Sequence, residues 1–79
     1  MRVNIAIEVP DSGVESELTQ KMPQVRNTII DLFNSKRPGD LIQSEGRDYL
    51  KEEIRSALNG FMTTGKVKGV FFTNFALSS

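Results

Sequence analysis

Residues 44–61 read SEGRDYLKEEIRSALNGF, and this stretch decides most of the fold. Its apolar side chains recur at the spacing of one face of an α-helix, at Leu50, Ile54, Ala57, Leu58 and Phe61. Charged pairs such as Asp48 with Lys51 fall on the opposite, solvated side. Because Ser44 is also a suitable N-cap, we predict an amphipathic helix over about residues 45–62.

A second apolar stripe lies N-terminal to this helix and predicts another helix, which ends near residue 35. Its members are Val25, Ile29, Leu32 and Phe33, and a shorter pattern of Val14, Leu18 and Met22 precedes it. Pro23 separates the two patterns, and its fixed φ and missing N–H would cost about 3 kcal/mol inside one continuous helix. We therefore predict a break or a sharp kink at Pro23. At the start, near Gly13, Ser12 and Glu15 have the spacing of a capping box.

Between these two helices, residues 36–40 contain Pro38 and Gly39 and predict a polar turn. Leu41 and Ile42 follow, and we expect both side chains to pin this connection to the core. Lys36 and Arg37 begin the turn and make it a candidate contact with other proteins.

Both ends of the chain have the character of β-strands. Residues 3–9 alternate more and less apolar side chains, so a strand there turns Val3, Ile5, Ile7 and Val9 to one face. Residues 66–77 are rich in β-branched and aromatic residues and predict a second strand. One of its faces would carry Val67, Phe71, Phe75 and Leu77, and the other Lys68, Val70, Phe72, Asn74 and Ala76. Because a solvated face does not normally hold Val70 and Phe72, we predict that another chain covers them.

These elements predict a single α+β domain over residues 1–79, with a small β-sheet and three helices in the order β-α-α-α-β. An isolated pair of strands is only marginally stable, so we expect further strands from outside this sequence or pairing between chains. The predicted core consists of Val3, Ile5, Ile7, Val9, Leu18, Val25, Ile29, Leu32, Phe33, Leu50, Ile54, Leu58, Phe61, Phe71 and Phe75.

The composition argues against several classes of function. Ten basic residues balance ten acidic ones, whereas proteins that bind nucleic acid electrostatically usually carry a basic excess. The chain has no cysteine and no histidine, so disulfides, thiolate zinc sites and the commonest acid–base group at neutral pH are excluded. We expect no enzyme activity, no cofactor and no metal.

The other polar and aromatic clusters have simpler interpretations than catalysis or base stacking. Glu52 and Glu53 are neighbours on a predicted helix and point about 100° apart, so they do not form an acid–base pair. The aromatic residues Phe71, Phe72 and Phe75 could stack nucleic-acid bases, but burial in a core or an interface is the favoured interpretation.

Four segments in a fixed order carry a family resemblance. They are the opening strand at 2–9, the step Met22-Pro23-Gln24-Val25-Arg26 into a helix, the helix at 44–59 with Leu50, Lys51, Glu52, Glu53 and Ile54, and Gly65-Lys66-Val67 leading into Val70-Phe71-Phe72-Thr73-Asn74-Phe75. Together they resemble the C-terminal domain of the FliL family of flagellar basal-body-associated proteins, over nearly the whole chain. Gly69 and Asn74 depart from the resemblance, since acidic side chains are expected at both positions.

The resemblance implies a single-pass inner-membrane protein whose C-terminal domain lies in the periplasm, at the flagellar basal body. It implies partners among flagellar stator proteins of the MotA/MotB type, support or regulation of torque generation and motility, and no catalysis. It also implies a fold similar to the stomatin-type (SPFH) domain and self-assembly into a ring around a stator. The family's membrane helix and a further β segment would lie upstream, and we interpret Met1, directly before a strand, as the start of an excised fragment.

Other interpretations remain open from the residues alone. One is a small nucleic-acid- or ligand-binding α+β module, for which Lys36 and Arg37, with the lysines at 66 and 68, would supply a small basic patch. A small hydrolase is a third possibility, disfavoured by the missing histidine and cysteine. For contacts with proteins, the candidate residues are Val70, Phe72, Lys36 and Arg37.

Overall fold

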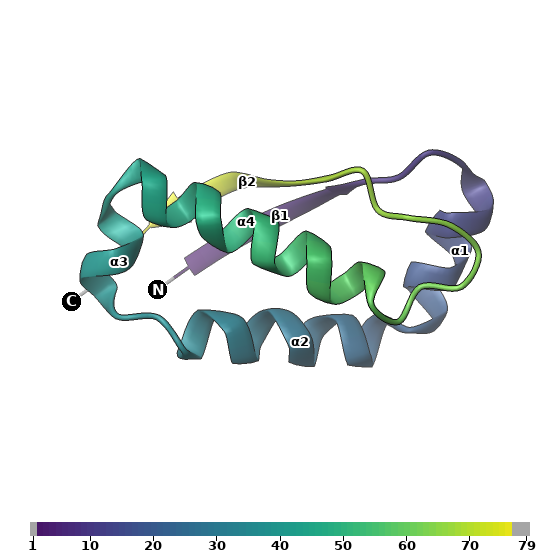
Figure 1. Cartoon of the computed structure of the whole chain (residues 1–79), viewed down its shortest axis with the longest axis horizontal. Helices are drawn as coiled ribbons and strands as arrows, with labels where there is room; N and C mark the ends of the chain where they lie inside the picture. Colours follow the sequence, from purple (N-terminus) through teal and green to yellow (C-terminus); the bar gives the residue numbers. More distant parts are fainter. Residues whose placement is uncertain (1, 77–79) are drawn as a thin grey trace.

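A computed structural model of the chain describes residues 2–76, with the side chains of Phe75 and Ala76 outside the described part. The element order is β1 (Arg2–Glu8), α1 (Ser12–Gln20), α2 (Met22–Asn34), α3 (Pro38–Ile42), α4 (Ser44–Asn59) and β2 (Gly69–Ala76). Helix α4 packs against both α2 and β2, so the helices and the sheet share one core (Figure 1). The predicted α+β class is confirmed, but the predicted number of helices is wrong because α3 adds a fourth.

The predicted break at Pro23 is confirmed. Helices α1 and α2 are separated by Lys21, whose backbone leaves the helical region at φ −98° and ψ 17°. Pro23 then lies in the first turn of α2, where a backbone N–H has no intrahelical partner and its loss costs little. The predicted cap of α1 is one residue out, because the Asp11 carboxylate, rather than the Ser12 hydroxyl, accepts a hydrogen bond from the Val14 N–H at 3.0 Å.

Helix α3 replaces the turn that the sequence predicts over residues 36–40. Pro38 begins it, and the Asp40 carboxylate accepts a hydrogen bond from the Arg37 N–H at 3.1 Å. The expectation for Leu41 is confirmed because its side chain is buried, whereas Ile42 is 65% exposed and does not pin the connection. The next helix is preceded by Gln43, so Ser44 is its first residue and not its cap.

Strands β1 and β2 form an antiparallel pair in which Ile7 faces Val70 and Ile5 faces Phe72. Directly opposite residues share a face of the sheet, so Val70 and Phe72 lie on the helical side. Val70 is 5% exposed and Phe72 is partly buried against the core, whereas Phe71 is 51% exposed. The predicted faces of this strand are therefore inverted: Val70 and Phe72 belong to the core, and Phe71 does not.

Two irregularities explain the inversion. Val67 is buried but lies in the loop before Gly69, outside the regular strand. Its inward orientation therefore does not show which residues of the strand face the core. The register also shifts between Asn4 and Ile5, where β2 holds one extra residue, Thr73, as in a β-bulge. A strict two-residue alternation over 66–77 therefore cannot describe the whole segment.

The hydrophobic core is centred on α4. Its buried members are Val14, Leu18, Val25, Phe33, Leu41, Leu50, Ile54, Leu58, Met62, Val67 and Val70. The predicted residues on β1 pack against this cluster while partly buried, as do Ile29, Leu32 and Phe61. The prediction for Phe75, and the placement of Leu77 in the second strand, lie outside the described side chains and residues.

We expect Leu58→Ala to lower the free energy of unfolding by about 2 to 5 kcal/mol, because it leaves a cavity beside a fully buried side chain. The matched control is Ile42→Ala, which removes an exposed apolar side chain and should change stability by less than about 0.5 kcal/mol. Urea unfolding of both variants followed by circular dichroism makes the comparison. Equal losses would mean that α4 does not organise the core.

Candidate functional site

A buried carboxylate, Glu17, joins α1 to the loop that follows α4. Its side chain is 6% exposed, and its oxygens accept hydrogen bonds from both the backbone N–H and the hydroxyl of Thr63 and of Thr64, at 2.6 to 3.1 Å. Lys21, which follows the last residue of α1, approaches the carboxylate at 2.6 Å and also donates to the Phe61 carbonyl at 2.7 Å. We call these residues the Glu17 clamp.

The clamp keeps Glu17 ionised. The Lys21 ammonium is the main cause, the Thr64 hydroxyl is next, and both hold the pKa of the Glu17 carboxyl far below its ordinary value of 4.5. A buried carboxylate without such donors would favour the neutral form instead. Its role is structural, because the donors saturate the oxygens that a ligand or substrate would need.

The sequence alone does not predict the Glu17 clamp. Glu17 and Lys21 have the spacing of an ordinary surface pair on a helix, and their partners lie more than forty residues away. The only local signal is that Glu17 falls next to Leu18 on the apolar side of α1. Nothing in the spacing shows that a turn with two threonines closes over it.

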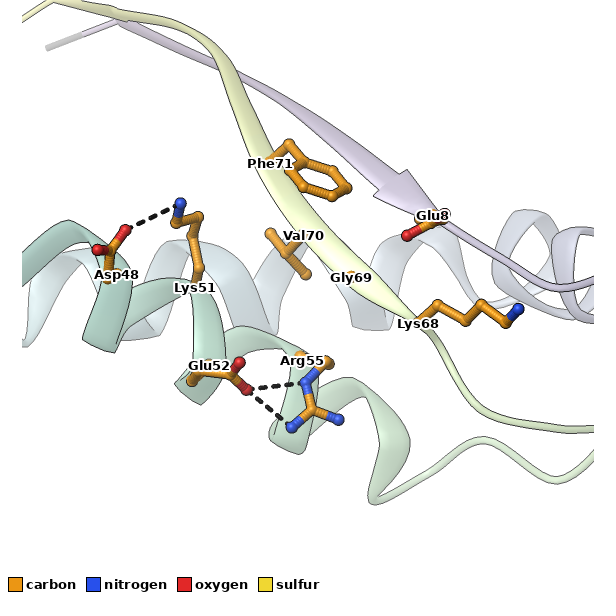
Figure 2. A pocket seen from close by; sticks show the side chains of 9 residues that line it. All are labelled: Glu8, Asp48, Lys51, Glu52, Arg55, Lys68, Gly69, Val70 and Phe71. Carbon is orange, nitrogen blue, oxygen red and sulfur yellow. Dashed lines mark hydrogen bonds and ion pairs between the residues drawn. The ribbon is translucent and has the colours of Figure 1, made fainter.

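A charged hollow of about 350 Å³ runs between α4 and β2, and we call it the β2–α4 groove (Figure 2). Its α4 wall carries two ion pairs, Asp48 with Lys51 at 3.0 Å and Glu52 with Arg55 at 2.7 Å. Its other side is formed by Glu8, Lys68, Gly69, Val70 and Phe71. Since acidic and basic side chains alternate, the groove has no strong preference for either an anion or a cation.

Gly69 lines this groove and lies beneath two neighbouring side chains. A Cβ atom at this position would lie 3.2 Å from the Phe71 ring and 3.3 Å from the Glu8 carboxylate, both of which cover the glycine. Figure 2 shows these two side chains on the side of β2 that faces away from α4. An exposed phenylalanine on a two-stranded sheet with open edges is a surface suited to another protein chain.

The four candidate contact residues do not come together. Val70 and Phe72 face the helices, where the Phe72 ring lies 5.8 Å from the Phe33 ring. Lys36 and Arg37 lie on the connection between α2 and α3. A contact surface on the sheet and one near α3 are therefore separate features.

Lys36 is not an open cationic site. Its ammonium lies 2.7 Å from the Glu53 carboxylate and 5.3 Å from the centre of the Tyr49 ring. The Glu53 carboxylate raises the pKa of Lys36 above its ordinary value. Of the predicted basic patch, Arg37 and the lysines at 66 and 68 are exposed, so a partner can reach them. Across the described residues, no group of acidic side chains is placed to hold a metal ion.

Comparison with known proteins matches residues 1–77 to the model of the family described as flagellar basal body-associated protein FliL. The chain belongs to the FliL family. It is 34% identical over 76 residues to the flagellar protein FliL of Aquifex aeolicus (strain VF5), which covers 96% of this chain and 47% of the relative. It is 26% identical over 77 residues to that of Bacillus subtilis (strain 168), with 98% and 55% covered. It is 28% identical over 79 residues to the flagellar protein FliL of Escherichia coli (strain K12), which covers 95% of this chain and 51% of the relative.

Membership of this family supports a flagellar role at the basal body and agrees with the resemblance that the sequence carries. The family is one of flagellar accessory proteins rather than of enzymes. This FliL domain spans about half the length of the curated relatives that it matches. Within residues 2–76, the helices are too short or too polar for one to cross a membrane.

We expect Glu17→Gln to lower the urea midpoint of unfolding at pH 7, because Lys21 loses its counter-charge and the threonine donors lose a charged acceptor. Glu15→Gln on the same helix is the matched control, since Glu15 is exposed and no clamp holds it. It should leave the midpoint nearly unchanged. Similar midpoints for the two variants would mean that the clamp adds nothing to stability.

The same contact predicts a pH dependence. The folded pKa of Glu17 is depressed, so its stabilising contribution is complete above the ordinary value of 4.5 and decreases as the pH falls below it. The difference in midpoint between the natural protein and Glu17→Gln should therefore shrink between pH 6 and about pH 3. A difference that stays constant over this range would contradict the assignment.

Proposed function

We propose that this FliL domain works in the periplasm as the non-catalytic, C-terminal part of a single-pass inner-membrane protein. There it assembles with other copies beside or around flagellar stator units and supports or regulates torque generation. Family membership carries the flagellar part of this proposal. The similarity of the fold to the stomatin-type domain, and ring formation, belong to the proposal as well.

The observation that carries the assembly part is the uncovered side of the sheet. The described helices cover one face of β1 and β2, and the other face carries Arg2, Asn4, Ala6, Glu8, Phe71 and Asn74, of which Phe71 is the large apolar one. The two strands also leave two unpaired edges within the described residues. Edges and apolar patches of this kind are places where another chain adds to a sheet or covers it.

The sheet residues that we propose for the contact with a partner therefore differ from those that the sequence predicts. Val70 and Phe72 pack on the helical side of β2 and would act by holding this strand in place. Phe71 points to the other side, where its ring would contact a partner. The region before α3 is the second proposed contact, with Arg37 as its accessible side chain. Lys36 would contribute there only by giving up its ion pair with Glu53.

The test is Phe71→Asp in the full-length, membrane-anchored protein. Carboxylates at a dry contact are costly, but an exposed one is nearly neutral, so association with stator units and motility should fall while the fold survives. The matched control is Tyr49→Asp, which changes an equally accessible aromatic side chain on α4. Co-purification with stator proteins and swimming speed are the measurements.

Retained association in Phe71→Asp, with a normal unfolding curve, would show that the outer face of the sheet is not the contact. The region around Arg37 would then be tested with Arg37→Glu. Loss in Tyr49→Asp but not in Phe71→Asp would place the contact on α4 instead.

A further inference from the structure

The outer side of α2 has the pattern of a helix that packs against another helix. Pro23, Asn27, Ile30 and Asn34 follow one another at intervals of four, three and four residues, and all are exposed. This spacing places them in one line along the helix, as in the seam of a coiled coil. Ile30, at 54% exposed, is the apolar residue in the middle of the line.

Two hollows flank Ile30. One, of about 490 Å³, is lined by Met22, Pro23, Arg26, Asn27 and Ile30, and the other, of about 210 Å³, by Val3, Ile5, Ile29, Ile30, Phe33 and Asn34. A side chain from a facing helix therefore has room on either side of Ile30. This arrangement of one projecting residue between hollows is the geometry in which helices interlock.

The charges beside this line are complementary to a second copy of the same helix. Arg26 lies on one flank and Asp31, five residues later, on the other, and neither forms an ion pair within the described residues. When two identical helices pack in parallel, a residue on one flank faces the partner's opposite flank five positions further along. Arg26 of each copy then meets Asp31 of the other.

We propose that α2 is a self-association surface on which two copies pack in parallel about a two-fold axis. Ile30 packs against Ile30 of the second copy, Asn27 pairs with its counterpart through their side-chain amides, and two Arg26–Asp31 ion pairs close the flanks. A polar asparagine within such a line is a known device for fixing register and favouring two parallel helices. An antiparallel pair would place like charges beside each other, with Arg26 near Arg26 and Asp31 near Asp31.

This contact goes beyond the proposed function and does not depend on it. A ring is built from contacts between two different surfaces of each copy, whereas a two-fold contact uses the same surface of both copies. The α2 contact would therefore join copies, or whole rings, in pairs. The line has a single large apolar residue and covers a 13-residue helix, so the contact is weak in dilute solution. Anchoring in a membrane would raise its occupancy through the local concentration.

Cysteine cross-linking tests the geometry directly, because the chain contains no cysteine of its own. In a parallel two-fold pair, each residue of the line faces its own counterpart, with Cα atoms within the roughly 7 Å that a disulfide spans. Asn27→Cys should therefore give a disulfide-linked dimer under mild oxidation at high protein concentration. Gln24→Cys, exposed on the same helix but off the line, is the matched control and should give at least about fivefold less dimer.

Charge exchange then tests the register. In the Asn27→Cys protein, Arg26→Asp or Asp31→Arg alone should lower the dimer yield several-fold, and the two together should restore it. All of these positions are exposed, so circular dichroism should report a normal fold. Equal yields from Asn27→Cys and Gln24→Cys, or a double exchange that fails to recover, would overturn the proposal. Because the readout needs only this chain, its failure leaves the flagellar proposal untouched.

Discussion

The contact on which the rest of this structure depends is the buried carboxylate of Glu17. It binds the turn at Thr63 and Thr64 through backbone and hydroxyl donors, and Lys21 offsets its charge. Few residues separate this turn from β2, so the clamp contributes to positioning the start of that strand. The phase of the strand decides in turn that Val70 faces the helices and Phe71 faces outward. A structural carboxylate on α1 thus holds the turn from which the chain returns to the sheet.

The fold places its helices on one side of a narrow sheet and leaves the other side open. Such an arrangement stabilises a small domain with one core, but the strand edges and Phe71 stay available for contacts. The β2–α4 groove along one of these edges carries alternating charges in local ion pairs, which disfavours non-specific adhesion of the edge to other strands. The open surfaces are therefore the ones that the proposed contacts with other proteins would use.

In the described residues, several charged side chains form hydrogen bonds and ion pairs that stabilise the fold. Glu17 is saturated by donors, Lys36 is held by Glu53, and the charges of α4 pair along the helix. Family membership points in the same direction, since the relatives are flagellar proteins. The proposed assembly would use surfaces rather than reactive groups, namely Phe71, the region around Arg37 and the outer line of α2.

The sequence by itself determined the α+β class, the break at Pro23, the apolar stripes of α2 and α4, and the inward face of β1. These follow from local rules, because helix and strand periodicity and the stereochemistry of proline act between near neighbours. Only the tertiary structure decided the face of β2, the fourth helix and the Glu17 clamp. The face of β2 depends on a register shift opposite Asn4 and on the loop that holds Val67, and the clamp joins residues more than forty positions apart. Such long-range contacts leave no period in the sequence, so the free Phe71 and the buried Phe72 could be told apart only in three dimensions.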